Sequence, residues 1–219
     1  MRRKRKITIL AACILSGLIL SPPGAQATLI TIAIEAVVDY IGDPDNYLQG
    51  NIKLGDIITG FYAYDSSSPD TNPSLSVGDY KQDSASFGIS LTVGGFEFKS
   101  DPTNLDFIVE IINDSTSGGL HDGYGVLSGS NLALSDGTIV DQISWWLGDS
   151  SGTALSSTDL PGAAPVLGAW QSNTLILGTG RLYGIEAHVT SVVVIPEPTT
   201  ILPLALGGLV FLRRNKKIR

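Results

Sequence analysis

Apolar and polar residues alternate with a period of two along much of this chain, and this pattern limits the possible folds more than any other feature. The clearest case is a run of five apolar residues at every second position: Ile30, Ile32, Ile34, Ala36 and Val38. Residues two apart on a β-strand share one face, so the run predicts a half-buried strand. No stretch within residues 28–195 shows the 3.6-residue period and capping signals of an amphipathic helix. We therefore expect an all-β domain.

The same criterion predicts several more strands, with turn-forming residues between them. They cover residues 57–64, 86–93, 96–98, 107–111, 124–127, 139–147, 174–177 and 182–195. Gly94 and Gly95 separate two of these strands and are typical of a tight hairpin. Many short strands with glycine-rich turns favour an antiparallel β-sandwich, with a jelly roll as the nearest variant. A solenoid is less favoured because the sequence has no repeat of fixed length.

Residues 148–165 differ from the rest of this region. They are rich in Ser, Thr, Gly, Ala and Pro and show no alternation. Long segments without secondary structure are uncommon in compact domains. We expect one long loop here that is either functional or mobile.

The N-terminal residues have the three parts of a secretory signal peptide. Residues 2–6 are basic, residues 7–20 are apolar, and residues 25–27 read Ala-Gln-Ala, which suits a signal peptidase. We therefore assign residues 1–27 to a signal peptide and residues 28–195 to an exported domain. Residues 10–13 also spell a lipoprotein cleavage box, but few apolar residues precede Cys13 and the apolar run continues beyond it. Ordinary cleavage is favoured for this reason.

Cys13 is the only cysteine in the chain. The exported domain therefore has no disulfide, no thiolate metal site and no cysteine nucleophile. Its stability must come from a hydrophobic core, for which its length is sufficient.

The exported domain is strongly acidic. Four basic and 21 acidic residues lie within residues 28–198, a net charge of −17. Such a field repels phosphate groups, so we do not expect nucleic acid or anionic lipid headgroups as partners. The same field attracts divalent cations.

Calcium is the metal that this acidity favours, and it is the one cofactor that we consider. Two turn-rich segments carry carboxylates beside an asparagine, with Asp43 and Asp45 in the first and Asp65 and Asp70 in the second. Calcium accepts such oxygen ligands in flexible geometries, although neither segment matches the EF-hand pattern. The alternative is ordinary turn chemistry, because Asp and Asn also favour turns for reasons of their own backbone.

Trp145 and Trp146 are adjacent on a predicted strand. Neighbouring side chains on a strand point to opposite faces, so one indole enters the core and the other faces outward. The outward ring, with Trp170 or Tyr183, is a candidate platform for a sugar ring. The alternative is that a loop such as 148–165 covers it.

Signals for catalysis are sparse, and we assign no catalytic residue. Residues 148–152 read Gly-Asp-Ser-Ser-Gly, which is similar to the loop around a serine nucleophile, but short matches of this kind recur by chance. His121 and His188 are the available histidine bases, and neither has a second histidine at metal-ligand spacing. Paired carboxylates also hydrolyse glycosidic bonds, but nothing singles out one pair among so many.

The C-terminal residues 196–219 have three parts as well. Pro196, Glu197 and Pro198 form an extended segment, because proline disfavours helical conformations around it. Residues 199–212 are apolar and uncharged, but a free-standing membrane helix needs about 20 residues, so we expect a short transmembrane helix that crosses only as a thinned or transient span. A basic end follows, comprising Arg213, Arg214, Lys216, Lys217 and Arg219. Basic residues stay on the cytoplasmic side, which leaves the rest of the chain outside.

This tripartite end resembles the PEP-CTERM sorting signal. The resemblance covers about the last tenth of the chain and implies recognition by an exosortase in the inner membrane of a Gram-negative, exopolysaccharide-producing bacterium. A tail of this kind is expected to anchor the protein briefly and then to be removed or transferred on the way to the cell surface. Ice-binding proteins can carry such a tail too, so the resemblance implies a route and not an activity. The alternative is a plain single-span anchor.

Three functions are consistent with these features. The leading hypothesis is a non-enzymatic cell-surface or extracellular-matrix protein that associates with exopolysaccharide. The second is a module that binds a glycan or ice, for which a flat row of exposed Thr or Trp side chains would be diagnostic. The third is a secreted hydrolase, which requires a cleft with close carboxylates or a Ser/His pair.

Overall fold

The computed structural model describes residues 29–116 and 121–196. This part of the chain is all-β, with ten strands and one short 3₁₀ helix, η1. The strands are β1 (Leu29–Gly42), β2 (Ile57–Asp65), β3 (Val77–Gln82), β4 (Gly88–Val93), β5 (Phe96–Lys99), β6 (Phe107–Ile112), β7 (Asp122–Ser128), β8 (Gln142–Asp149), β9 (Ser172–Gly178) and β10 (Gly184–Ile195), and η1 is Leu167–Ala169.

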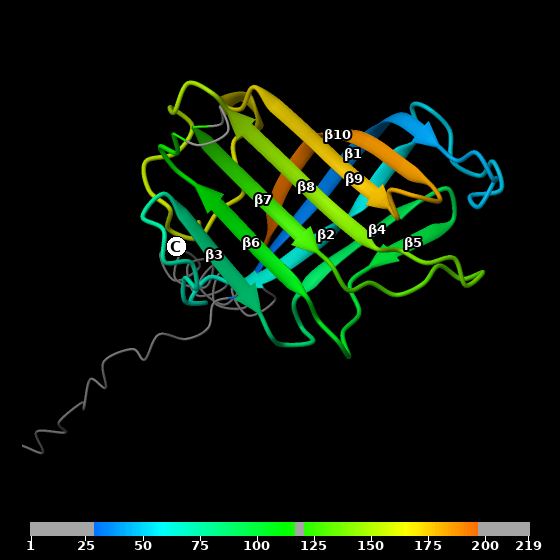
Figure 1. Ribbon diagram of the computed structural model, residues 1–219, viewed down its shortest axis with the longest axis horizontal. Helices are drawn as coiled ribbons and strands as arrows, with labels where there is room; N and C mark the ends of the chain where they lie inside the picture. Colours follow the sequence, from blue (N-terminus) through cyan, green and yellow to red (C-terminus); the bar gives the residue numbers. More distant parts are fainter. Residues whose placement is uncertain (1–28, 117–120, 197–219) are drawn as a thin grey trace, which may run out of the picture.

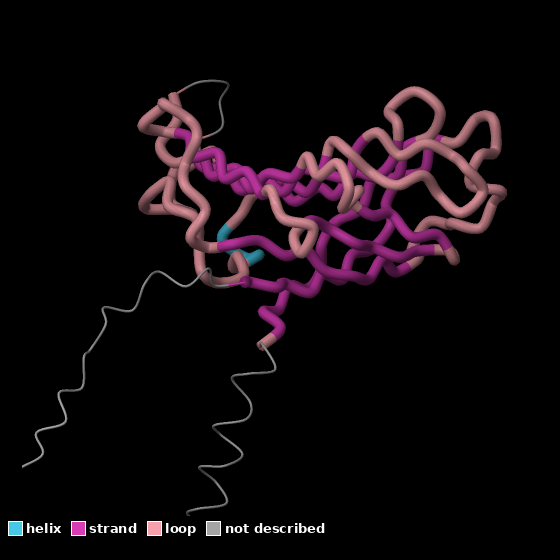
Figure 2. Tube along the Cα trace, turned by 90° about the horizontal axis from the view of Figure 1, so that it is seen from below, coloured by secondary structure: helices cyan, strands magenta, loops and turns pink. Residues whose placement is uncertain are grey.

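All ten strands belong to one antiparallel sheet with the order β3-β6-β7-β8-β9-β10-β1-β2-β4-β5. The sheet curls, so that β3, β6, β7 and β8 cross in front of β1, β2 and β4 in Figure 1, and Figure 2 shows the two layers from the side. The predicted antiparallel all-β fold is confirmed. The two layers resemble the predicted sandwich, but they are halves of one continuous sheet.

The long strands β1 and β10 carry the sheet around its corner. Within β10, only Gly184–Ala187 pair with β9. Beyond Ala187, β10 pairs with β1 alone. The pairing of β1 with β10 shifts register twice, between Glu35 and Ala36 and between Val38 and Tyr40. Bulges of this kind bend a strand and increase its twist, which allows one sheet to form two layers.

The space between the layers is filled by the inward residues of every strand, including the five predicted for β1. An aromatic cluster lies at its centre. The Trp145 ring meets the rings of Tyr62 and Tyr124 edge-on, at centroid distances of 6.1 and 5.8 Å. The Tyr62 and Tyr124 hydroxyls, both buried, form a hydrogen bond of 2.8 Å. Burial raises the pKa of both hydroxyls, so they remain protonated and serve as hydrogen-bond partners.

The sequence did not predict β3. Its inward positions are Gly78, Tyr80 and Gln82, so alternation of apolar residues is absent and the strand forms through its pairing with β6. β8 also begins later than predicted, at Gln142.

The long loop after β8 is firmly attached to the rest of the domain. The carboxylate of Asp122 accepts hydrogen bonds from the backbone N–H groups of Ala154 and Leu155, both at 2.9 Å. Further along, the hydroxyls of Tyr80 and Tyr64 donate to the carbonyl oxygens of Thr158 and Pro161. Apolar residues of the loop pack against the core: Leu155, Leu160, Ala164, Leu167 and Trp170. The loop therefore closes one side of the core.

Candidate functional site

Three of the four candidate calcium ligands accept hydrogen bonds, whereas the exposed Asp45 accepts none from the residues that the structure describes. Asp43 accepts the N–H groups of Tyr47 and Leu48, at 2.7 and 2.8 Å. Asp65 accepts the N–H and hydroxyl of Ser67, and Asp70 accepts the N–H groups of Asn72 and Asp79. The backbone contacts of Asp65 with Ser67 and of Asp70 with Asn72 are those of Asx turns, which reach two residues along the chain.

The structure does not bring the two acidic segments together. Leu29, at the start of β1, pairs with Asp65, whereas Asp43 follows the other end of this 14-residue strand. Among residues 29–116 and 121–196, no group of three or more His, Cys, Asp or Glu side chains is arranged to hold a metal ion. Calcium binding at these residues therefore stays a hypothesis, with ordinary turn chemistry as the alternative.

The two adjacent tryptophans point to opposite faces, as β-strand geometry requires. Trp145 is fully buried, and its indole N–H donates to the Asn173 side chain at 2.9 Å. Trp146 is half-buried on the outer face. Its ring packs on Gly125 of β7, and a Cβ atom on Gly125 would lie 2.8 Å from that ring. Tyr183 is buried and donates to the Ile139 carbonyl oxygen, so its ring is not an exposed platform.

The Ser/Gly segment after β8 is a hydrogen-bonded turn. The Ser151 hydroxyl lies 2.8 and 2.7 Å from the two carboxylate oxygens of Asp149, and its backbone N–H also donates to that carboxylate. His121 lies beside Gly152, but its ring forms no hydrogen bond with any residue that the structure describes. His188 lies on the outer face of β10, and its Nδ1 atom forms a hydrogen bond of 2.7 Å with a carboxylate oxygen of Asp39.

The outer face also carries neighbouring threonines. Thr59 of β2 pairs with Thr92 of β4, and their hydroxyls lie 3.3 Å apart. Glu35 and Glu97 flank this pair on the adjacent strands. Charged side chains therefore interrupt the flat threonine row that would be typical of ice binding.

The sorting tail lies almost entirely outside the described residues. Pro196 directly follows β10 and is described, whereas Glu197, Pro198, the apolar segment 199–212 and the basic end 213–219 are not. The signal peptide, residues 1–27, lies outside as well. Among residues 29–116 and 121–196, no helix has the length and apolar character needed to cross a membrane.

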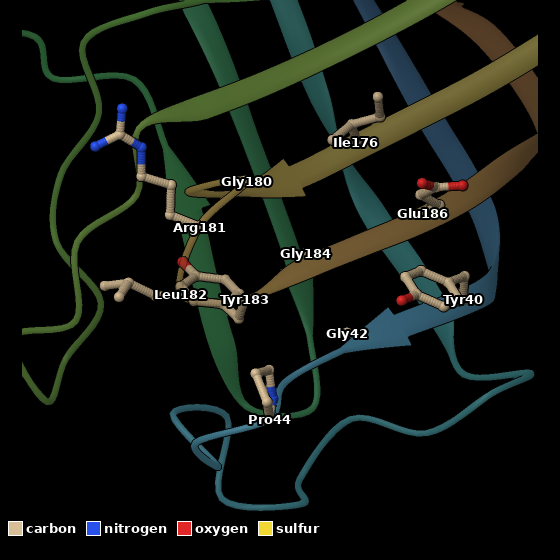
Figure 3. Close-up of a pocket in the computed structure, with 10 residues that line it drawn as sticks. All are labelled: Tyr40, Gly42, Pro44, Ile176, Gly180, Arg181, Leu182, Tyr183, Gly184 and Glu186. Carbon is tan, nitrogen blue, oxygen red and sulfur yellow. The ribbon is translucent and has the colours of Figure 1, made fainter.

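A shallow pocket on the outer face, where β1 meets β10, is a candidate site for a ligand. It has a volume of about 260 Å³, and we call it the Tyr40 pocket (Figure 3). Its described lining residues are Tyr40, Gly42, Pro44, Ile176, Gly180, Arg181, Leu182, Tyr183, Gly184 and Glu186. They come from the ends of β1 and β9, the start of β10 and the turns beside them.

A β-bulge directs Tyr40 toward solvent. Val38 pairs with Ala187 and Tyr40 pairs with Glu186, so Asp39 is an extra residue without a partner in β10. Strict alternation after the buried Val38 would turn Tyr40 into the core. Because the bulge absorbs one residue, Tyr40 is instead 55% exposed, and the next residue, Ile41, packs toward the core. Bulges often redirect side chains at functional sites.

The exposed Tyr40 ring is held against the backbone. A Cβ on Gly42 would come within 3.0 Å of the Tyr40 hydroxyl and 3.2 Å of its ring, so the ring covers this glycine. Glu186 lies opposite on β10, while Arg181 lies at the far end of the pocket, on the turn between β9 and β10 (Figure 3). A flat apolar surface beside a hydrogen-bond acceptor is what a sugar ring requires.

Tyr183 forms the inner wall of this pocket. Burial raises the pKa of its hydroxyl, and the carboxylates of Asp136, Asp141 and Asp43 raise it further. The hydroxyl therefore stays neutral, and the surroundings of the pocket are acidic.

Sequence reasoning missed this site. Tyr40 continues the alternation that begins at Ile30, so its position in the pattern predicts burial. The bulge that exposes it depends on β10, which lies far away in the sequence.

No protein-family model, no curated protein and no solved structure was found to match this chain.

Proposed function

We propose that this chain is a non-enzymatic cell-surface or extracellular-matrix protein whose all-β domain binds a glycan of the surrounding exopolysaccharide through the Tyr40 pocket. The observation that carries the proposal is the exposed Tyr40 ring, which lies against Gly42 and opposite Glu186. Glycan sites commonly combine a fixed apolar platform with a few polar groups, and a fixed platform loses little entropy on binding.

The route to the surface is part of the proposal. The signal-peptide pattern of residues 1–27 and the tail at Pro196, Glu197 and Pro198 support export and sorting by an exosortase in the inner membrane of a Gram-negative bacterium. The described chain is compatible with this route because β10 ends at Ile195, directly before the motif.

Binding to the exopolysaccharide of the producing organism tests the domain's role. We expect the mature protein, collected from those cells, to sediment with the polysaccharide, and the Tyr40→Ala variant to remain in solution. Phe61→Ala is the matched control, because Phe61 is another exposed aromatic residue on the outer face, 44% accessible, outside the pocket. Equal sedimentation of all three proteins would contradict the proposal.

Mass spectrometry of the mature surface protein tests the route. Sorting predicts a C-terminus at or near residues 196–198 and no peptide containing Arg219. A mature chain that retains Arg219 would instead identify a plain membrane anchor.

A further inference from the structure

The charges around Tyr40 indicate which glycans the pocket accepts. Tyr40 and Glu186 are direct cross-strand partners on the outer face, where paired side chains have their Cβ atoms about 5 Å apart. A sugar ring stacked on Tyr40 therefore has a carboxylate beside it. Asp39, the bulge residue next to Tyr40, carries a further carboxylate outside the pocket lining, and it is hydrogen-bonded to His188.

Positive charge is scarce at the same place. Of the described residues that line the pocket, Arg181 is the one cation, and Figure 3 shows it at the end remote from Tyr40. Asp43, Asp136 and Asp141 are close enough to Tyr183 to raise the pKa of its hydroxyl, so the field on this side is also negative. A carboxylate or sulfate on a sugar stacked on Tyr40 would be repelled by Glu186, its nearest charged neighbour in the pocket, and by the negative field of the domain.

We infer that the Tyr40 pocket binds neutral sugars and amino sugars and discriminates against uronates and sulfated sugars. In this arrangement Tyr40 stacks on the C–H face of a pyranose, and Glu186 accepts hydrogen bonds from its hydroxyl or ammonium group. The inference rests on the proposed function, because it names the ligand class of the same pocket.

Three β1,4-linked tetrasaccharides that differ in charge provide the test: cellotetraose (neutral), the chitosan tetramer (cationic) and the cellouronate tetramer (anionic). Binding of the full-length chain is measured by calorimetry in a non-ionic detergent without a sugar headgroup. At low salt we expect the anionic tetramer to bind at least about tenfold more weakly than the neutral one, and the cationic tetramer to bind most tightly. Both differences should shrink at about 0.5 M salt, where such charges are screened.

Variants connect the result to the pocket. Tyr40→Ala should weaken binding of cellotetraose by about tenfold or more, whereas Tyr40→Phe and the control Phe61→Ala should retain it. Glu186→Gln should remove the preference for the chitosan tetramer while leaving cellotetraose bound, because glutamine still accepts a hydrogen bond but has no charge. Tyr40, Phe61 and Glu186 are all exposed, so these variants should fold.

The outcomes separate the two proposals. Tight binding of the cellouronate tetramer through Tyr40 would overturn the inference about ligand class and leave glycan binding standing. If none of the three tetramers binds and the wild-type protein does not sediment with the native exopolysaccharide, glycan binding itself is overturned.

Discussion

Single polar side chains at the strand ends satisfy several buried groups at once. Asn173 is the clearest example. Its carbonyl oxygen accepts the Trp145 indole N–H and the Val189 backbone N–H, and its amide donates to the Val189 carbonyl oxygen at 2.7 Å. These contacts lie where β9 stops pairing with β10, so one side chain completes the hydrogen bonds that the missing strand would make.

Replacing Asn173 by leucine should lower the free energy of unfolding by about 2–4 kcal/mol, because it leaves buried donors and an acceptor unpaired. Urea unfolding followed by tryptophan fluorescence measures this loss. The neighbouring Thr174→Val is the control, with an expected change within about 0.5 kcal/mol. Similar stabilities for the two variants would show that Asn173 is not required.

Asp149 should make the stability depend on pH in the acidic range. Hydrogen bonds from the N–H groups of Thr153 and Ser151, and from the Ser151 hydroxyl, lower the pKa of its carboxyl to about 2. In the unfolded chain the ordinary value is about 3.9. The stabilisation is therefore complete above about pH 4 and is lost as the pH falls through about 2.

Asp149→Asn should remove this dependence. We expect the variant to be less stable than the wild type at pH 6 and the difference to narrow at pH 2, as measured by urea unfolding at each pH. A difference that is independent of pH would rule out this carboxylate as the titrating group.

At the scale of elements, the loop over residues 150–171 depends on contacts with distant strands. The fully buried Asp122, at the start of β7, accepts the Asp114 N–H with one oxygen and the N–H groups of Ala154 and Leu155 with the other. The side-chain carbonyl of Gln171 accepts hydrogen bonds from the backbone N–H and the hydroxyl of Ser150, and these bonds join the two ends of the loop. A segment that looked featureless in the sequence is therefore ordered by residues outside it.

Asp122→Ala should open this loop selectively. Losing the acceptor of two amides costs about 1–3 kcal/mol, so their hydrogen exchange should accelerate by about ten- to a hundredfold. Hydrogen exchange of the Ala154 and Leu155 amides, followed by NMR, measures the change. The control is Asp159→Ala, in the exposed part of the loop, which should leave these amides protected. Equal rates in both variants would contradict the role of Asp122.

At the scale of the whole molecule, the excess of carboxylates opposes folding through mutual repulsion. Four basic residues within residues 28–198 cannot balance 21 acidic ones. In the described chain, the Lys99–Glu97 ion pair and the His188–Asp39 contact both lie at the surface. Surface pairs of this kind contribute little. Screening of the repulsion should therefore stabilise the domain.

Raising NaCl from 20 to 300 mM should raise the melting temperature by a few degrees. CaCl₂ at matched ionic strength should do no more, because Asp43, Asp65 and Asp70 already accept backbone hydrogen bonds. Differential scanning calorimetry compares the two salts. A larger, saturable rise with calcium that Asp43→Asn abolishes would instead assign a specific calcium site.

The sequence by itself determined the strands whose inward residues are apolar. Alternation located β1 through its five apolar positions, and the glycine pair located the hairpin between β4 and β5. Strand geometry also required that Trp145 and Trp146 face opposite ways. These features could be predicted because they depend on residues close together in the chain.

Only the tertiary structure decided the rest. It joined the two layers into one curled sheet, formed β3 against β6 without an apolar pattern, and placed Asp122 under a loop 32 residues further along. It also exposed Tyr40, because pairing with β10 leaves Asp39 as a bulge. Each of these features depends on which distant segments meet, and a local pattern carries no information about that choice.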